Sequence, residues 1–392
     1  MDVDGDRLSD LRLRGGRVVE VERGLTPRQG ERVFDATEHM ALPGLINAHD
    51  HLDLNLLPHL GQPPYENAYQ WAEEIYRPDA PPIDAHLRVT LRDRLWWSAY
   101  KNLVGGVTTV VHHGDYHRRV FSPWFGRRFP IRVLERYAWC HSLGFGDPGT
   151  AYSPRMRRAR TPFIIHAAEG TDQRSQEEVD QLDRLGLLAP NTILVHGIGL
   201  TSSGRQRVAE SGAGIVWCPS SNLWLYGATA PIDLLPEGVR LGLGTDSTLS
   251  GEPTLLAELR AAAGTHLLSA DRLLRLVTTE AAELFGFTDG RGTLRRGAPG
   301  DLLLLPERGG PPAEQLLKTA PADLQLVLVA GRPRLATAPA AEAVGLDPPN
   351  ARIGASPVWM TGDPAALRER IAAASGAELV RDHPLWELIQ GP

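Results

Sequence analysis

The sequence predicts an α/β fold, a (β/α)8-type, TIM-like barrel with a small β-sandwich beside it. Between residues 41 and 289, apolar runs alternate with helical segments, a pattern typical of parallel sheets. Four of these runs end in a His or Asp, and a parallel barrel places its functional side chains at the carboxyl ends of its strands. Short alternating strands stand before and after this region. We therefore expect a barrel over 41–289, a sandwich built from 1–40 together with 290–345, and a C-terminal extension over 346–392.

Composition narrows the class of protein. A chain of 392 residues can hold one large barrel and a smaller module. Its net charge of −6 offers no basic footprint for nucleic acid. No apolar run is long enough to span a bilayer, and the first residues lack a signal-peptide pattern. The two cysteines, Cys140 and Cys218, predict no disulfide framework. We expect a cytoplasmic protein with no membrane partner.

The elements follow in chain order. Residues 11–14 and 17–21 alternate around Gly15-Gly16, which predicts a hairpin. Predicted helices begin at polar caps, including Asp84 and a capping box that opens at Ser175, and stop at glycines. Helices are expected over 83–104, from 175 to 186, over 254–263, over 269–285 and near 364–374. Barrel strands are expected over 42–51, 107–111, 132–140, 163–165, 192–196, 212–217 and 239–246, and later strands over 301–305, 324–329 and 332–334.

The region of the fourth barrel strand is short. Only 22 residues separate Cys140 from Phe163, whereas one crossover between parallel strands normally needs a dozen or more residues. Residues 144–162 are also rich in Gly, Pro and Arg. We expect strand 4 or its helix to be truncated or rebuilt, which would leave the barrel irregular there.

The first barrel strand ends in His49 and His51. Side chains two apart on a strand leave the same face, so both imidazoles point one way. Two neutral imidazoles on one strand end make half of a divalent-metal site. An isolated pair of this kind is better explained by one packed histidine and one loop histidine, so the interpretation depends on the other strand ends.

Three later apolar runs end at His166, His196 and Asp246, and Glu169 follows three residues after His166. Because the carboxyl ends of parallel strands meet at one mouth, we expect these side chains to lie close to the first pair. Taken alone, Glu169 would suit the start of a helix. Asp246 would suit a helix cap, a role compatible with binding a metal.

Six further residues are candidates for contacts with a substrate. Residues 53–82 leave the first strand as a long loop rich in proline and aromatic residues, which predicts that it lies over the site or packs on the barrel. The other candidates follow strands 2, 3 and 7. For the histidines, packing or indirect support of the site is the more common role. The six residues are Trp71, His112, His113, His141, Asn222 and Trp224.

With these residues assembled, the chain resembles the amidohydrolase superfamily. It is most similar to the mononuclear aminohydrolases, namely cytosine, guanine and S-adenosylhomocysteine deaminases and the triazine hydrolases. The resemblance covers about residues 1–340. It rests on PGLINAHDH at 43–51, HAAE at 166–169, His196, CPSSN at 218–222, GTDS at 244–247 and GTLRRGAPGD at 292–301.

The resemblance implies an enzyme that uses one divalent metal, Zn²⁺ or Fe²⁺, to hydrolyse a small molecule. The metal ligands would be His49, His51, His166 and Asp246. The metal would acidify a bound water. Glu169 would move a proton from that water to a ring nitrogen and then to the leaving amine. His196 would orient the hydroxide or polarise the attacked bond, and Asp246 would accept the water's proton.

One metal is expected rather than two. The binuclear branch of the superfamily uses a carboxylated lysine on strand 4, and neither Lys101 nor Lys318 falls on a strand end before His166. Enzymes that this chain resembles are commonly oligomers, but nothing in the sequence determines a subunit number.

Three functions stay open on this basis. The first is deamination of an amino-substituted heterocycle or a nucleoside-like compound. The second is cleavage of a cyclic amide, an imidazolone-like ring or an exocyclic C–N or C–Cl bond by the same mechanism. The third is a metal-binding module without catalysis, whose only support is the short strand 4 region.

Overall fold

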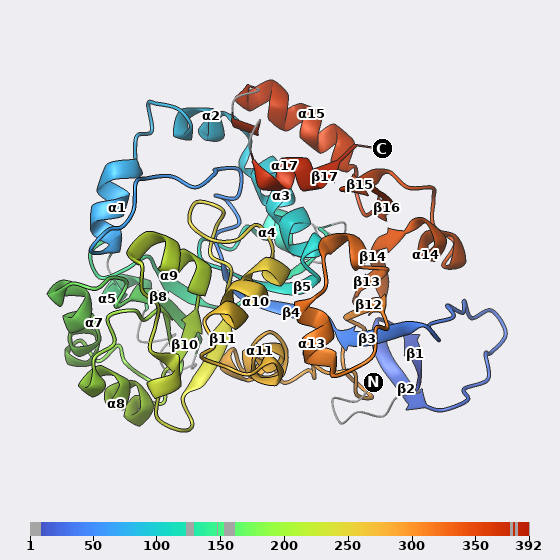
Figure 1. Cartoon of the computed structure of the whole chain (residues 1–392), viewed down its shortest axis with the longest axis horizontal. Helices are drawn as coiled ribbons and strands as arrows, with labels where there is room; N and C mark the ends of the chain where they lie inside the picture. The colour runs from blue at the N-terminus through green and yellow to red at the C-terminus, as the bar shows by residue number, and fades with distance from the viewer. Residues whose placement is uncertain are drawn as a thin grey trace.

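The computed structural model describes residues 9–122, 129–146, 148–152, 161–376, 379–380 and 383–391. It is an α/β structure with two parts that lie side by side (Figure 1). Parallel strands surrounded by helices form one part, and a mainly antiparallel sheet forms the other. No helix among the described residues has both the length and the apolar character needed to cross a membrane.

The parallel strands form two sheets. The first has the order β4-β5-β6, and the second has the order β11-β10-β9-β8-β7. Nearly every residue in these strands is buried, as expected where helices cover the outer faces of parallel strands. The strands are β4 (Leu45–Asp50), β5 (Val107–His112), β6 (Arg132–Val133), β7 (Ala138–Cys140), β8 (Phe163–Ala167), β9 (Thr192–His196), β10 (Gly214–Trp217) and β11 (Arg240–Leu243).

Backbone contacts connect the two parallel sheets at both edges. At one edge, the amide of Asp246, just beyond β11, donates to the carbonyl of His49 in β4 at 3.1 Å. At the other edge, residues 132–133 pair with β5, and residues 138–140 pair with β8. The single strand predicted over 132–140 is therefore two short strands, one on each sheet, because residues 134–137 leave the pairing between them.

No strand stands between β7 and β8 among the described residues, and the two strands pair directly. The described parts of the connection, residues 141–146, 148–152 and 161–162, contain the short helix α5 (Pro148–Ala151). Residues 147 and 153–160 of the segment expected to replace strand 4 lie outside the described residues. One nine-residue stretch, 132–140, thus connects the pairing of β5 to that of β8.

Two predicted helices are each divided in the structure. The helix expected over 83–104 is α2 (Ile83–Arg88) followed by α3 (Leu91–Val104), because Thr90 accepts a hydrogen bond from the amide of Asp93 and caps α3. Asp84 does not cap a helix but pairs with Arg88 within α2. The helix expected over 269–285 is α11 (Ala270–Leu276) and α12 (Thr279–Leu284), which are separated by two non-helical residues.

The helix predicted to open at a Ser175 capping box begins earlier. In α7 (Gln173–Arg184), the N-cap is Asp172, whose carboxylate accepts from the amide of Ser175 at 3.0 Å. Gly186 follows the helix with φ 63°, a left-handed conformation that glycine adopts without strain. The other helices of this part are α1 (Ala68–Ile75), α4 (Arg118–Phe121), α8 (Ser202–Ser211), α9 (Pro219–Tyr226), the 3₁₀ helix η1 (Ile232–Leu234) and α10 (Leu255–Gly264).

The second part is a seven-stranded sheet to which segments far apart in the sequence contribute. Its order is β17-β15-β16-β14-β13-β12-β3, and all pairs are antiparallel. The strands are β3 (His39–Pro43), β12 (Leu302–Pro306), β13 (Leu326–Val329), β14 (Arg332–Thr337), β15 (Ala351–Ile353), β16 (Ser356–Met360) and β17 (Ile389–Gln390). The tail expected as a separate extension therefore supplies three strands of this sheet, together with α15 (Pro364–Ser375) and α17 (Pro384–Leu388). The remaining short helices are α13 (Pro312–Leu317), η2 (Pro321–Asp323) and α14 (Ala338–Ala343).

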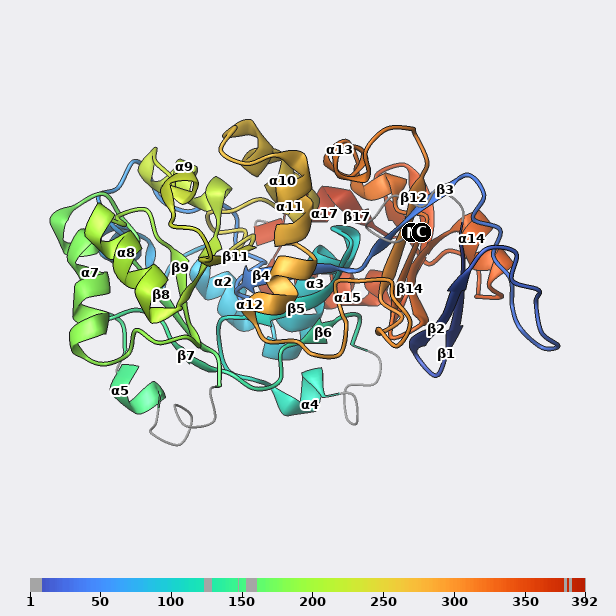
Figure 2. The same cartoon turned by 90° about the horizontal axis from the view of Figure 1, so that it is seen from below.

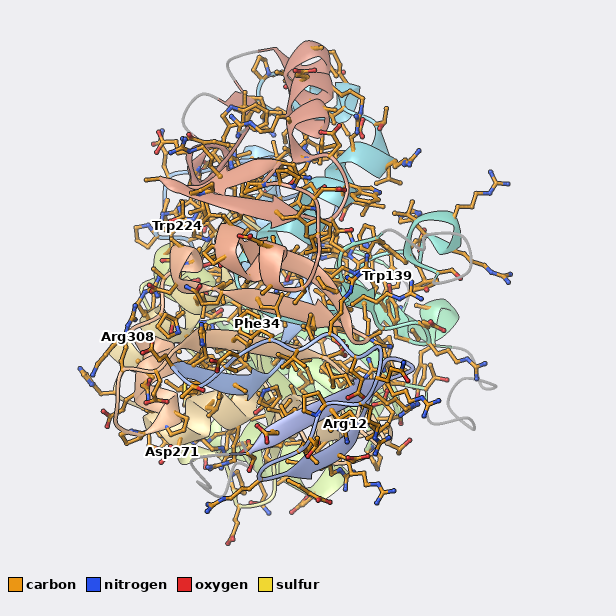
Figure 3. The ribbon with its side chains drawn as sticks, turned by 90° about the vertical axis from the view of Figure 1, so that its right-hand side faces the viewer. Arg12, Phe34, Trp139, Trp224, Asp271 and Arg308 are labelled. Atoms are coloured by element: carbon orange, nitrogen blue, oxygen red, sulfur yellow. The ribbon has the colours of Figure 1, made fainter. Side chains whose placement is uncertain are left out.

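A hairpin of β1 (Asp10–Arg14) and β2 (Arg17–Glu22) lies beside this sheet (Figure 2). Gly15 and Gly16 turn it with φ values of 60° and 79°, as a two-residue hairpin turn requires. Apolar residues of β1 and of the loop that follows β2, including Phe34, pack on the apolar cluster of β12 and β13. Figure 3 shows this side of the molecule, with Arg12 on the hairpin.

Candidate metal centre and active site

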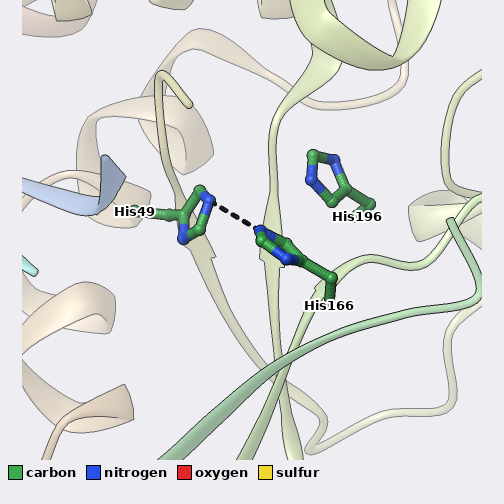
Figure 4. A group of neighbouring side chains, drawn as sticks. All are labelled: His49, His166 and His196. Atoms are coloured by element: carbon green, nitrogen blue, oxygen red, sulfur yellow. Dashed lines mark hydrogen bonds between the residues drawn. The ribbon is translucent and has the colours of Figure 1, made fainter. Parts of the chain in front are cut away.

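Three histidines from two strand ends converge on one point. The Nε2 atom of His166 lies 3.2 Å from Nε2 of His49 and 3.4 Å from Nε2 of His51. His49 is the penultimate residue of β4, His51 comes directly after that strand, and His166 lies near the end of β8. All three side chains are buried. Figure 4 shows His49 and His166 meeting, with the ring of His196 beside them.

Asp246 adds a carboxylate to this cluster. Its Oδ1 atom lies 3.7 Å from Nε2 of His49 and 3.6 Å from Nε2 of His51. Its Oδ2 atom accepts hydrogen bonds from the hydroxyls of Ser221 and Ser250, each at 2.9 Å. The carboxylate is thereby held with one oxygen toward the histidines.

The electrostatics of the cluster suit a cation. Burial lowers the pKa of His49 to about 3 and that of His166 well below its ordinary value, so these imidazoles are neutral and their nitrogens can offer lone pairs. Burial pushes the pKa of Asp246 upward, but the hydrogen bond with His49 and the neighbouring histidines outweigh it and hold the pKa well below the usual range.

The donor set fits a divalent metal ion. Three imidazole nitrogens and one carboxylate oxygen, all buried and facing one another, form the kind of set that binds zinc or a similar first-row ion. Without a cation, the Nε2 lone pairs would oppose each other at little more than 3 Å. His49, His166 and His196 also bring ring nitrogens close enough to hold an ion together.

Glu169 and His196 lie next to the cluster and face each other. The Nε2 atom of His196 is 3.6 Å from Oε1 of Glu169, and the hydroxyl of Tyr226 donates to the same oxygen at 2.8 Å. Burial raises the pKa of Glu169 to about 7. A carboxyl group with this pKa can give up or take a proton near neutrality.

Asn222 determines the tautomer of His196. Its Oδ1 atom lies 2.8 Å from Nδ1 of His196, and an amide oxygen can only accept a hydrogen bond. Nδ1 therefore carries the hydrogen, and in the neutral ring Nε2 keeps its lone pair toward Glu169. Asn222 therefore orients His196, and its predicted contact with a substrate stays a prediction.

Hydrogen bonds from α1 and α7 hold the segment that carries Glu169. The amide of Ala168 donates to Oε2 of Glu178 in α7 at 2.7 Å, and Tyr69 of α1 donates to the other oxygen of Glu178 at 2.6 Å. The predicted covering loop is pinned to the same segment, because the amide of Ala68 donates to the carbonyl of Glu169 at 3.1 Å. The loop thus packs against the site.

The other predicted contacts divide into two groups. His113 stacks on His166 with ring centroids 4.2 Å apart and its Nε2 lies 3.1 Å from the carbonyl of Cys140, so it packs behind a candidate ligand. His112 is buried, where its Nδ1 accepts from the amide of Leu52 at 3.2 Å. Both histidines thus pack against the strands, and their predicted contacts with a substrate stay predictions.

His141, Trp71 and Trp224 border the site. His141 is exposed, and its ring centroid lies 4.7 Å from that of His166. Trp71 and Trp224 both pack on an apolar cluster that contains Tyr226. The structure therefore places His141 at the mouth and the two tryptophans beside the residue that holds Glu169.

A buried ion pair beneath the cluster was missed from the sequence. Lys101 of α3 donates to Asp50, the residue between the two histidines of β4, at 3.0 Å. It also donates to Oγ1 of Thr245 at 2.9 Å and to the carbonyl of Asp246 at 3.0 Å. Lys101 thus joins the ends of β4 and β11. A lone lysine within a helix carries no sequence signal for this role.

Comparison with known proteins places the chain in a family. A model of the amidohydrolase family matches residues 161–347. The 5-methylthioadenosine/S-adenosylhomocysteine deaminase of Natronomonas pharaonis is 33% identical over 334 residues, which are 70% of this chain and 75% of that protein. The chain belongs to the amidohydrolase family. The 8-oxoguanine deaminase of Pseudomonas aeruginosa is more distant, with 26% identity over 383 residues, 76% of this chain and 82% of that protein.

Solved structures share the fold of this amidohydrolase. Atrazine chlorohydrolase TrzN from Arthrobacter aurescens, complexed with zinc, matches with a TM-score of 0.69 and 20% identity over 95% of each chain. An adenosine deaminase from Xanthomonas campestris with bound zinc matches with a TM-score of 0.67 and 20% identity over 86% of this chain and 91% of that one. The resemblance stated from the sequence motifs is confirmed, and the chain is a hydrolytic enzyme related to deaminases.

Proposed function

We propose that this amidohydrolase removes the exocyclic amino group of an adenine nucleoside or a similar amino-substituted heterocycle. The observation that carries the proposal is the placement of Glu169. A buried carboxyl group whose pKa is about 7 lies beside His196 and next to a cluster of three histidines and an aspartate. Relatives at 33% and 34% identity are named 5-methylthioadenosine/S-adenosylhomocysteine deaminases, which supports the adenine class.

One Zn²⁺ ion is the proposed cofactor, held by His49, His51, His166 and Asp246. When bound, such an ion supplies Lewis-acid chemistry that makes water a stronger acid near neutral pH. We also propose that the two parallel sheets together form one closed barrel around this point. The hydrogen bond from Asp246 to His49 and the pairing of 132–140 on both sides support that closure.

The residues of the chain divide the proton transfers among them. Asp246 and Glu169 accept protons from the attacking water, and Glu169 delivers its proton to the ring nitrogen beside the attacked carbon. The second proton of the water then passes from Asp246 through Glu169 to the amine. The C–N bond breaks, and ammonia leaves while the carbon keeps the oxygen of water. His196, held by Asn222, aligns its Nε2 lone pair with the attacking water.

The substrate is expected to enter past His141. This ring is exposed at the mouth, whereas His113 packs behind His166. Trp71 and Trp224 would form the apolar wall of the substrate site, because both pack on the cluster that contains Tyr226. Flat heterocycles suit such aromatic walls.

The test is ammonia release by zinc-loaded protein with 5′-deoxyadenosine, 5-methylthioadenosine, S-adenosylhomocysteine, 8-oxoguanine and cytosine. We expect release from at least one adenine nucleoside. Glu169→Gln should abolish it, and Glu177→Gln, an exposed residue of α7, should leave it unchanged. Ammonia release that Glu169→Gln retains would contradict the proposed role of Glu169. If protein that holds its metal releases no ammonia from any of these compounds, the result would contradict deamination.

A further inference from the structure

A cavity of about 870 Å³ lies away from the candidate metal centre, at the junction of the two parts of the molecule. Its walls come from the β1–β2 turn, residues 131–136, the segment after α12 and the β13–β14 hairpin. Figure 2 shows β6 beside the sheet that contains β14. The volume falls within the range of about 300–1,000 Å³ that is typical of small-molecule sites. None of the residues assigned above to the metal or to proton transfer lines it.

Arginines dominate the charge of this cavity. Five line it, from three separate segments of the chain, namely Arg132, Arg136, Arg291, Arg332 and Arg334. Among the described residues, Glu135 is the acidic residue of the lining, and Asp289 and Asp301 pair with Arg291 and Arg132. The described lining thus holds five guanidinium groups and one carboxylate, with two more carboxylates beside it, in a chain whose overall net charge is −6.

Two of the five arginines already have acidic partners. Arg291 forms a two-pronged contact with Asp289, with Nη2 at 2.7 Å from Oδ2 and Nε at 3.1 Å from Oδ1. The Nε atom of Arg132 lies 3.2 Å from Oδ2 of Asp301, but neither atom has a well-formed hydrogen bond among the described residues. This second pair leaves a buried donor that another acceptor could satisfy.

The remaining three arginines have no acidic partner within the described parts of the chain. Nη1 of Arg334 donates to the hydroxyl of Thr361 at 3.3 Å, and its buried Nε lacks an acceptor among the described residues. Burial and the charges of Arg332 and Arg132 lower the pKa of Arg334. Like charges gathered around a half-buried guanidinium are unfavourable without an anion among them.

The rest of the wall is apolar and partly aromatic. Phe121, Phe129 and Phe287 line the cavity together with aliphatic side chains. Guanidinium groups bind phosphate oxygens in a two-pronged geometry, and aromatic rings bind flat apolar groups. The two kinds of wall together suit a ligand that combines both features.

We propose that this cavity binds a small polyanion, an organic compound with two or more phosphate groups joined to a flat apolar body. The ligand would lie with its phosphates toward Arg136, Arg332 and Arg334 and its apolar body toward the phenylalanines. The site is separate from the proposed reaction, so its test does not depend on the deaminase assignment.

The test is calorimetric titration of the full-length, zinc-loaded protein with UDP, with inorganic pyrophosphate and with uridine. UDP has no exocyclic amino group, so it is not a substrate for the proposed activity. We expect UDP to bind, to bind more weakly as the salt concentration rises, and uridine to give no signal. Pyrophosphate that binds as tightly as UDP would identify free polyphosphate as the ligand, whereas weaker binding would identify a phosphorylated organic compound.

The double variant Arg332→Gln/Arg334→Gln should weaken UDP binding at least tenfold. Arg92→Gln, an exposed arginine of α3 outside the cavity, is the matched control and should bind as the wild type does. Arg136→Gln, at an exposed position, provides a second variant if the double variant fails to fold, and it should weaken binding severalfold. Absence of UDP binding would overturn the proposal. UDP binding that the cavity variants retain would also overturn it, because chelation of the metal would give that result.

Discussion

Three residues other than glycine adopt left-handed backbone conformations at the carboxyl ends of the parallel strands. They are Ala168, His196 and Asp246, with φ values of 53°, 77° and 55°. Such conformations are strained for these side chains and persist where the surroundings hold them. Here the strain turns the chain so that Glu169, His196 and Asp246 face the histidine cluster. Sequence patterns place these residues at strand ends, but they do not predict the sharp local turns.

The hydroxyl group of Tyr226 influences the pKa of Glu169. Its hydrogen bond to Glu169 lowers the pKa of that carboxyl, against the larger upward effect of burial. Tyr226→Phe should therefore let the pKa of Glu169 rise further. If ionised Glu169 accepts the proton of water, the acid limb of the kcat/KM profile will move to higher pH in the variant. An unchanged profile, with metal content equal to that of the wild type, would contradict the role of this hydroxyl.

The buried ion pair of Lys101 with Asp50 contributes to the stability of the fold. Replacing Lys101 with methionine leaves Asp50 buried with its charge unpaired, although Asn55 and Asn102 still donate to it. Breaking a buried ion pair from one side typically costs about 3–5 kcal/mol. Urea unfolding of Lys101→Met should show a loss of that order. The double variant Lys101→Met/Asp50→Asn should recover part of it, because the amide carries no charge. Equal stability of the single and double variants would contradict a paired charge.

At the scale of elements, strands were easier to predict from the sequence than helix boundaries. The apolar runs that end at His49, His166 and His196 are β4, β8 and β9, because a strand buried on both faces needs a continuous apolar sequence. The helix expected over 83–104 is interrupted because Thr90 caps α3 within it, and the helix expected over 269–285 is interrupted at residues 277–278. Segment 132–140 could not be resolved into two strands, because pairing partners do not appear in a local pattern.

The start of α7 offers a direct test of such a boundary. Asp172 caps the helix, whereas the sequence favours Ser175. Asp172→Ala should lower the free energy of unfolding by about 1 kcal/mol. Ser175→Ala should change it less, because the Ser175 hydroxyl has no hydrogen-bond partner among the described residues. Chemical unfolding of both variants would measure this, and the reverse order of effects would contradict the assignment of the cap.

At the scale of the whole molecule, both ends of the chain build one sheet beside the parallel strands. β3 pairs with β12 across more than 250 residues of sequence, and the tail adds β15, β16 and β17. The sequence predicts the pairing of the two ends in outline, from short strands at 1–40 and after 290. It does not predict that residues 351–390 join the same sheet, because β15 and β17 are only three and two residues long.

The proposed metal site would couple to the stability of the whole chain, because its candidate ligands come from the ends of β4, β8 and β11. A metal that binds only the folded state stabilises it by about 2.7 kcal/mol at a free concentration of a hundred times its Kd. Removing the metal with a chelator should lower the melting temperature, and adding zinc back should restore it. A melting temperature that neither chelation nor added zinc changes would contradict a metal site in the folded protein.

The proposed metal centre is tested by the metal content per chain of the purified protein and of His166→Ala. His166 touches both His49 and His51, so its loss removes the ligand at the centre of the cluster. His59→Ala, at an exposed histidine of the covering loop, is the matched control. We expect one zinc ion per chain in the wild type and in the control, and a large loss in His166→Ala. A metal content that His166→Ala leaves unchanged would contradict the proposed metal centre.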